Sequence, residues 1–253
     1  MIFTLSIQTY ILIIIAFLLE IVWSGGFKFL YTNPRFTNKF TLYISSLLNI
    51  NPAVVSSSLL TFYYLTAALT GSILISLYSG CNVISLFLIN GNYKVIPITL
   101  LGAFASFSLT SLGFSMLYVI FPHIDIVEEI NKIRWISGIK KLPKNIAFIV
   151  PALSACAEEL FFRGVLLNAL IKNGFSFWLS LTIVTILFVY GQVILTDTKI
   201  QALVISISSF VISIIGGLLF ITTGSIISSM IVHASFAGFY TQSNNKKEGK
   251  VMI

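Results

Sequence analysis

Three ionisable residues interrupt an apolar stretch of this sequence, SACAEELFFRGVLLNAL, which runs from residue 154 to residue 170. They are the adjacent glutamates Glu158 and Glu159, and Arg163. Glu159 and Arg163 are four residues apart, so on a helix they share a face and can form an ion pair. Glu158 points about 100° away from Glu159 around the helix axis. The spacing predicts one carboxylate held by the arginine and a second that is available as a general base.

The composition indicates that these residues lie in a membrane. Of 253 residues, 57% are hydrophobic and only 9% are charged, whereas soluble domains carry about 25% charged residues. Several runs of about 20 residues have almost no charge, which is the length that crosses a hydrocarbon core. We therefore predict an all-α, polytopic membrane helical bundle that forms a single integral membrane domain over residues 1–253, in contact with the lipid bilayer.

We expect about seven transmembrane helices, each an apolar run close to the length of a membrane span. They cover roughly residues 3–24, 52–78, 95–121, 146–172, 176–195, 201–220 and 225–241. The segment 79–94 is expected at the membrane interface. The polar stretch 122–145 has isoleucines at helical spacing and predicts an amphipathic helix on the membrane surface.

The basic residues are divided unevenly between the two sides that these spans define. One side carries twelve of them and the other carries two, Lys94 and Lys172. Because basic residues gather in cytoplasmic loops, the asymmetry predicts a multi-pass protein of the cell membrane with its N-terminus outside and its C-terminus cytoplasmic. The same rule accounts for the net charge of +7, so no nucleic-acid partner is expected. The twelve residues are Lys28, Arg35, Lys39, Lys132, Arg134, Lys140, Lys141, Lys144, Lys199, Lys246, Lys247 and Lys250.

Charged side chains inside a span are costly and normally mark a functional site. Each costs roughly 2.5–3.5 kcal/mol at a helix centre, so three unpaired charges would cost on the order of 7–10 kcal/mol. A structural cluster that joins helices is the alternative for Glu159 and Arg163, but it leaves Glu158 unexplained. A further acid, Glu20, lies near the cytoplasmic end of the first predicted span and is expected to reach toward the interface.

The run EELFFR, Glu158 to Arg163, followed by Gly164, resembles the EExxxR motif of the CPBP family. This family groups CAAX prenyl proteases of the Ras-converting type with bacteriocin-processing and self-immunity proteins of bacteria. The resemblance covers roughly residues 146–241 and implies that they form the catalytic core region. It further implies a glutamate-dependent intramembrane endopeptidase that acts on a peptide or a membrane-anchored protein.

The other two motifs of the family are only partly present. The FxxxH motif corresponds to FVYGQ, in which Gln192 stands in place of the histidine. The third motif, a histidine followed four residues later by Asn or Asp, corresponds to HASFA, in which His233 matches and Ala237 does not. The resemblance implies that Glu158 activates a water and His233 assists, while the amide of Gln192 can still donate a hydrogen bond. We expect these three side chains to converge on a cytoplasm-facing cavity.

The resemblance also leaves an alternative open. Glu159 and Arg163 are the supporting pair in this interpretation, and both are intact. Because Gln192 cannot act as a base and the side chain of Ala237 donates nothing, the chain could instead be a catalytically weakened or inactive relative. Such a protein would act as an immunity or scaffold protein in the membrane.

Other membrane chemistries fit the sequence less well. Zinc hydrolysis normally needs at least three protein ligands, and His233 is the only histidine in a predicted span, so we expect no metal and no cofactor. Asp125 and Asp197, which an aspartyl site would need, both fall in connectors. A serine site at the GFS of 113–115 is weakened because GFS recurs at 174–176. A proton-coupled transporter would be expected to show an inverted repeat, and we see none.

Overall fold

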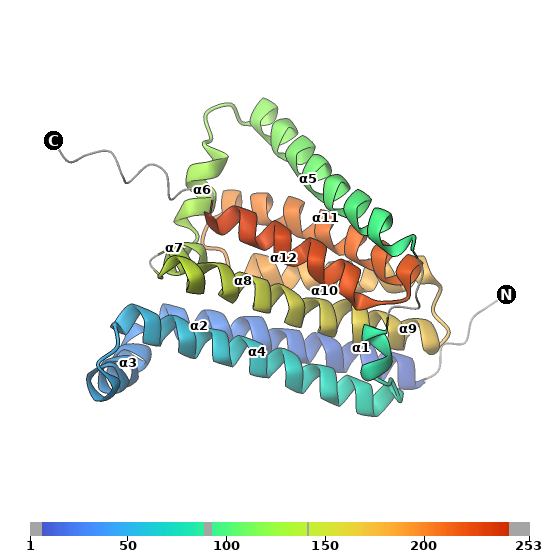
Figure 1. Ribbon diagram of the computed structural model, residues 1–253, viewed down its shortest axis with the longest axis horizontal. Coiled ribbons are helices and arrows are strands. Elements are labelled where there is room, and N and C mark those ends of the chain that lie inside the picture. The colour runs from blue at the N-terminus through green and yellow to red at the C-terminus, as the bar shows by residue number, and fades with distance from the viewer. Residues whose placement is uncertain (1–6, 89–92, 141, 243–253) are drawn as a thin grey trace.

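The computed structural model describes residues 7–88, 93–140 and 142–242. These residues form a bundle of helices, and none of them lies in a β-strand (Figure 1). The predicted fold class, an all-α polytopic helical bundle, is confirmed. The elements of the first half are α1 (Ile7–Glu20), the π-helical η1 (Ile21–Gly25), α2 (Gly26–Thr32), α3 (Pro34–Leu48), α4 (Pro52–Ser79), the short 3-10 helix η2 (Ile84–Phe87) and α5 (Val95–Ile120). Those of the second half are α6 (Ile126–Lys132), α7 (Arg134–Lys140), α8 (Lys144–Glu159), the π-helical η3 (Leu160–Leu167), α9 (Asn168–Lys172), α10 (Phe177–Ile194), α11 (Lys199–Thr223) and α12 (Ile226–Gln242).

Each of the seven segments predicted as spans is largely helical in its described residues. Within the described ranges, five helices are long and apolar enough to cross a membrane: Ile7–Thr32, Pro52–Ser79, Val95–Ile120, Phe177–Ile194 and Lys199–Thr223. The two remaining predicted spans are 146–172 and 225–241. The first of them corresponds to the run α8–η3–α9, which carries the glutamates, and the second to α12, whose apolar part Ile226–Phe239 is shorter.

The first membrane-spanning helix, Ile7–Thr32, is longer than predicted. We expected it to end at residue 24, but it continues through η1 and α2 to Thr32. It ends there because a proline disfavours helical backbone at the preceding residue, and Asn33 before Pro34 has φ −105° and ψ 79°. The expected connector then forms a helix of its own, α3, which lies across the end of α4 (Figure 1).

The stretch 122–145 is helical, in two pieces rather than one. Ile133 has an extended backbone, with φ −60° and ψ 121°, and separates α6 from α7. Ile130, Ile133 and Ile136 are buried and pack with residues of α5 and α11. The segment 79–94 contains η2, whose Leu86 is buried in the main core, and its residues 89–92 lie outside the described residues.

The centre of the bundle is η3, in which all eight residues are buried. It contacts α4, α8, α10 and α11. In the described part of the chain, both π-helical segments begin directly after a glutamate, η1 after Glu20 and η3 after Glu159. Segments of π-helix occur frequently at functional sites, and here both adjoin buried acids.

One end of the bundle gathers α3, α6 and α7 together with the first residues of α8 and α11 (Figure 1). These elements carry most of the basic residues that define the predicted cytoplasmic side. Four others, Lys141, Lys246, Lys247 and Lys250, lie outside the described residues.

Candidate active site

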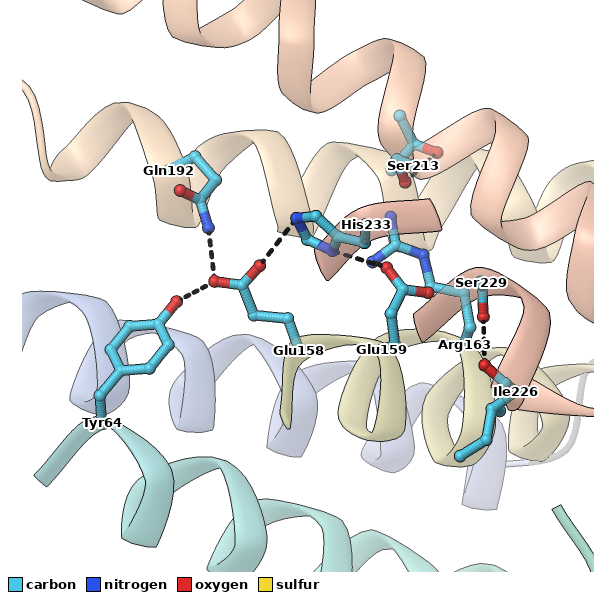
Figure 2. A network of polar contacts seen from close by, with 10 residues as sticks. Tyr64, Glu158, Glu159, Arg163, Gln192, Ser213, Ile226, Ser229 and His233 are labelled. Atoms are coloured by element: carbon cyan, nitrogen blue, oxygen red, sulfur yellow. Dashed lines mark hydrogen bonds and ion pairs between the residues drawn. The ribbon is translucent and has the colours of Figure 1, made fainter. Parts of the chain in front are cut away.

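Glu158, near the end of α8, points toward three side chains from other helices (Figure 2). Its Oε1 accepts hydrogen bonds from the hydroxyl of Tyr64 on α4 and, at 3.0 Å, from Nε2 of Gln192 on α10. Its Oε2 lies 3.6 Å from Nε2 of His233 on α12. The structure therefore brings together Glu158, Gln192 and His233, the three residues predicted to be catalytic.

Glu159 faces a separate, sealed region of the core. Its Oε1 lies 3.1 Å from Nη1 of Arg163, and both side chains are fully buried. Gly216 of α11 covers this pair, and a Cβ at that position would lie 3.1 Å from Oε2 of Glu159. The guanidinium carbon lies 4.4 Å from the ring centroid of Phe188, within the range of a cation–π contact. The predicted ion pair between Glu159 and Arg163 is thus formed, and Gly216 and Phe188 pack against it.

His233 connects the two glutamates. Its Nδ1 lies 2.9 Å from Oε1 of Glu159, and its Nε2 faces Oε2 of Glu158. A neutral imidazole that donates from Nδ1 to Glu159 presents the lone pair of Nε2 toward Glu158. Glu159 therefore has a second contact that the sequence did not predict, since it orients this histidine as well as pairing with Arg163.

A cavity of about 350 Å³ leads to this group of residues. Tyr64, Glu158, Gln192 and His233 line its inner end, together with Ala237. The cavity extends to α7, at the end of the bundle where the basic residues gather. Its further walls are mainly apolar and include Phe27, Tyr31, Leu60, Trp135, Ile139 and Pro151.

The expectation that Glu20 reaches toward the interface was wrong. Its side chain is only 2% exposed and lies against Gly191 of α10. The physical reason is a gap over Gly191, where a Cβ would lie 1.8 Å from Oε1 of Glu20. The carboxyl occupies that gap and accepts a hydrogen bond from Ser24. The carboxyl of Glu20 therefore packs against Gly191, the residue that precedes Gln192.

Tyr64 is the site residue that sequence reasoning missed. Two adjacent tyrosines, Tyr63 and Tyr64, fall in the middle of the span 52–78, and a buried phenol usually needs a hydrogen-bond partner. That signal was present in the sequence, but it does not tell which tyrosine faces the site. In the structure Tyr63 donates to the carbonyl oxygen of Val22 at 2.6 Å, whereas Tyr64 donates to Glu158.

Comparison with known proteins finds a similarity in the second half of the chain. Residues 143–239 match the family model of type II CAAX prenyl endopeptidases, Rce1-like. The matched segment runs from the start of α8 into α12 and contains Glu158, Gln192 and His233. The predicted resemblance to the CPBP family is confirmed over these residues, which are similar to CAAX-type intramembrane proteases, and the apolar helices are those of a multi-pass membrane protein.

The match leaves the first half of the chain, including Glu20 and Tyr64, without a counterpart in the family model. No curated protein and no solved structure matches the chain. Among the described residues, no group of three or more His, Cys, Asp and Glu side chains is arranged to hold a metal ion.

Proposed function

We propose that this chain is a membrane-embedded endopeptidase in which Glu158 takes a proton from an attacking water and His233 assists. The observation that carries the proposal is the pair of atoms at the inner end of the cavity, Oε2 of Glu158 and Nε2 of His233, which lie 3.6 Å apart. Because Nδ1 of His233 donates its hydrogen bond to Glu159, Nε2 of His233 and Oε2 of Glu158 are both acceptors. A water between them can donate one hydrogen to each, which leaves a lone pair on its oxygen free to attack.

The reaction then follows from the positions of these groups. The water oxygen bonds to the carbonyl carbon of the substrate, the π electron pair of that carbonyl moves onto its oxygen, and one water proton passes to Glu158. When the carbonyl re-forms, the C–N bond breaks and the amine leaves with the proton from Glu158. The products are a carboxylic acid and an amine, and Glu158 is again a carboxylate.

The remaining residues are proposed to hold this pair in place. Glu159 fixes the ring of His233, and Arg163 neutralises Glu159 in the sealed core. Gln192 holds the other oxygen of Glu158. In this proposal residues 146–241 are the catalytic core region, and the largely apolar cavity takes a peptide or the end of a membrane-anchored protein.

A direct test uses the full chain purified in detergent and a library of peptides, with cleavage followed by mass spectrometry. The wild type should cleave a subset of them, and Glu158→Gln should lower the rate by about 10²–10⁴-fold, the usual contribution of a general base. Elution of the variant at the wild-type volume in size-exclusion chromatography shows that the fold is kept. Equal cleavage by the two proteins would refute the role of Glu158.

A second function is favoured by one specific observation. Ala237 lines the cavity at the position where the family has Asn or Asp, so the wall lacks that donor. A weakened relative could serve as an immunity protein, for example against bacteriocins, or as a scaffold. In that case the wild type would cleave nothing in the library, and its biological activity would survive Glu158→Gln.

We also propose that the cavity opens toward the cytoplasm, with the N-terminus outside and the C-terminus inside. The support is the clustering of basic residues at the end of the bundle to which the cavity extends. A reporter fused after residue 253 should behave as cytoplasmic. A reporter that is active only outside the cell would reverse the orientation.

A further inference from the structure

The proposed reaction needs a hydrogen-bond donor aimed at the carbonyl oxygen on which negative charge develops. The residues of the matched segment do not readily provide one. The side chain of Ala237 is a methyl group, one of the two N–H bonds of the Gln192 amide is used by Glu158, and His233 lies between the two glutamates. Any further donor has to come from another part of the cavity wall.

Tyr64 is such a donor, and it comes from outside the matched segment. It lies on α4, and its hydroxyl reaches Oε1 of Glu158 at the inner end of the cavity (Figure 2). Its ring is held between Trp23 and Phe27, with ring centroids at 4.9 Å and 5.2 Å. The side chain is 7% exposed. The phenol oxygen is therefore fixed in place, and only its O–H bond is free to turn.

We propose that Tyr64 is a catalytic residue whose hydroxyl donates a hydrogen bond to the oxyanion of the tetrahedral intermediate. As the water oxygen bonds to the carbonyl carbon, the π electron pair moves onto the carbonyl oxygen, and the O–H of Tyr64 turns from Glu158 to that oxygen. No proton is transferred from Tyr64, so the phenol is unchanged when the C–N bond breaks. Glu158 keeps a donor on the same oxygen throughout, because Gln192 remains bonded to it. This inference rests on the proposed function.

The primary test compares two tyrosines that are adjacent on α4. Tyr64→Phe keeps the ring packing and removes the donor, so kcat should fall by about 10²–10³-fold, as for the loss of one oxyanion donor, with little change in KM. Tyr63→Phe is the matched control, because the hydroxyl of Tyr63 binds the carbonyl oxygen of Val22 and Tyr63 is not among the residues that line the cavity. It should cleave at the wild-type rate.

Two further measurements separate donation to the oxyanion from positioning of Glu158. Tyr64→Phe removes a hydrogen bond to Glu158 in the free enzyme, so the acidic limb of the pH profile of kcat/KM is displaced in either role. Loss of a donor to the oxyanion also lowers the plateau above that limb, whereas an effect on Glu158 alone leaves the plateau where it is. Ala237→Asn offers an amide in the same cavity, so it should restore more activity to Tyr64→Phe than it adds to the wild type. A displaced limb that accounts for the whole loss of rate would overturn the assignment.

The outcomes also separate this inference from the proposed function. If the wild type cleaves in a Glu158-dependent manner and Tyr64→Phe is as active as Tyr63→Phe, the inference fails and the function stands. If neither the wild type nor Tyr63→Phe shows Glu158-dependent cleavage, the function fails and the role of Tyr64 fails with it.

Discussion

Glu158 and Glu159 are neighbours in the chain and both are buried, yet they lie in two different regions of the core. The region around Glu158 is the inner end of a cavity, where the carboxylate meets the neutral donors Tyr64 and Gln192. The region around Glu159 is closed, and there the carboxylate meets the guanidinium of Arg163. A rotation of about 100° between successive helix residues is enough to give two identical side chains opposite surroundings.

From this difference we expect Glu158 and Glu159 to have different roles, although they lie within one helical turn. A carboxylate held by neutral donors beside a cavity can exchange a proton with a substrate, whereas one held by a buried cation is fixed in charge and position. His233 is the connection between the regions, since its two ring nitrogens face one glutamate each. The comparison therefore predicts that substitutions in the closed region affect folding and those in the cavity affect chemistry.

The largest expected effect is that of Arg163→Ala on stability. Removing one partner of a buried ion pair leaves an uncompensated charge and costs about 3–5 kcal/mol. We expect a sharp fall in the yield of folded protein and in the thermal unfolding temperature in detergent. Glu158→Gln should leave both nearly unchanged, because the partners Tyr64 and Gln192 carry no charge.

A matched variant sharpens this result. Replacing both members of the closed pair, with Glu159→Gln and Arg163→Met, removes the charges together and should recover much of the lost stability. If Arg163→Ala and Glu158→Gln unfold at the same temperature, the two regions do not differ in the way proposed here.

The next effect is on catalysis and comes from the cavity. Gln192→His combined with Ala237→Asn introduces the residues that the family has at these positions, and it should raise kcat by up to about 10²-fold if one good oxyanion donor is gained. Adding Glu158→Gln should remove the gain, because a donor to the oxyanion needs an activated water to act upon. The measurement is cleavage by the wild type, the double variant and the triple variant side by side.

Two outcomes would change the interpretation. Cleavage by the wild type that the double variant does not improve would mean that the existing donors are already adequate. No cleavage by any of the three proteins would favour the immunity or scaffold function.

The closed region was more predictable from the sequence than the cavity. Contact between Glu159 and Arg163 follows from their spacing on one helix, and the apolar runs give the all-α bundle directly. Tyr64 and Glu20 were missed or misplaced because their roles depend on how α4 and η1 are rotated about their axes. Those rotations are set by packing between distant segments, such as the carboxyl of Glu20 in the gap over Gly191, which no local spacing reveals.

A smaller effect should come from filling that gap. In Gly191→Ala the new methyl group would lie 1.8 Å from Oε1 of Glu20, and overpacking of this kind typically costs about 1–3 kcal/mol. Because Gln192 is the next residue, we also expect cleavage to slow. The measurements are the thermal unfolding temperature and kcat/KM.

Two variants show whether space is the cause. Gly25→Ala is the control, since a Cβ there meets nothing within 4 Å, and it should be neutral or stabilising by about 0.5–1 kcal/mol. Adding Glu20→Ala to Gly191→Ala frees the space and should restore the unfolding temperature. Failure of this rescue would mean that the carboxyl of Glu20 matters for more than the volume it fills.

The smallest effect concerns an ion pair outside both regions. Arg134 on α7, at the outer wall of the cavity, lies 3.0 Å from Asp197 in the connector between α10 and α11, with side chains 56% and 29% exposed. Exposed pairs contribute about 0–1 kcal/mol, and salt screens them. Asp197→Asn should therefore lower the unfolding temperature only slightly, and the difference from the wild type should shrink as the ionic strength rises. The difference caused by Arg163→Ala should not respond to salt, because its pair is sealed from solvent. A loss in Asp197→Asn as large as that in Arg163→Ala, or one that salt does not change, would show that burial is not what distinguishes the two pairs.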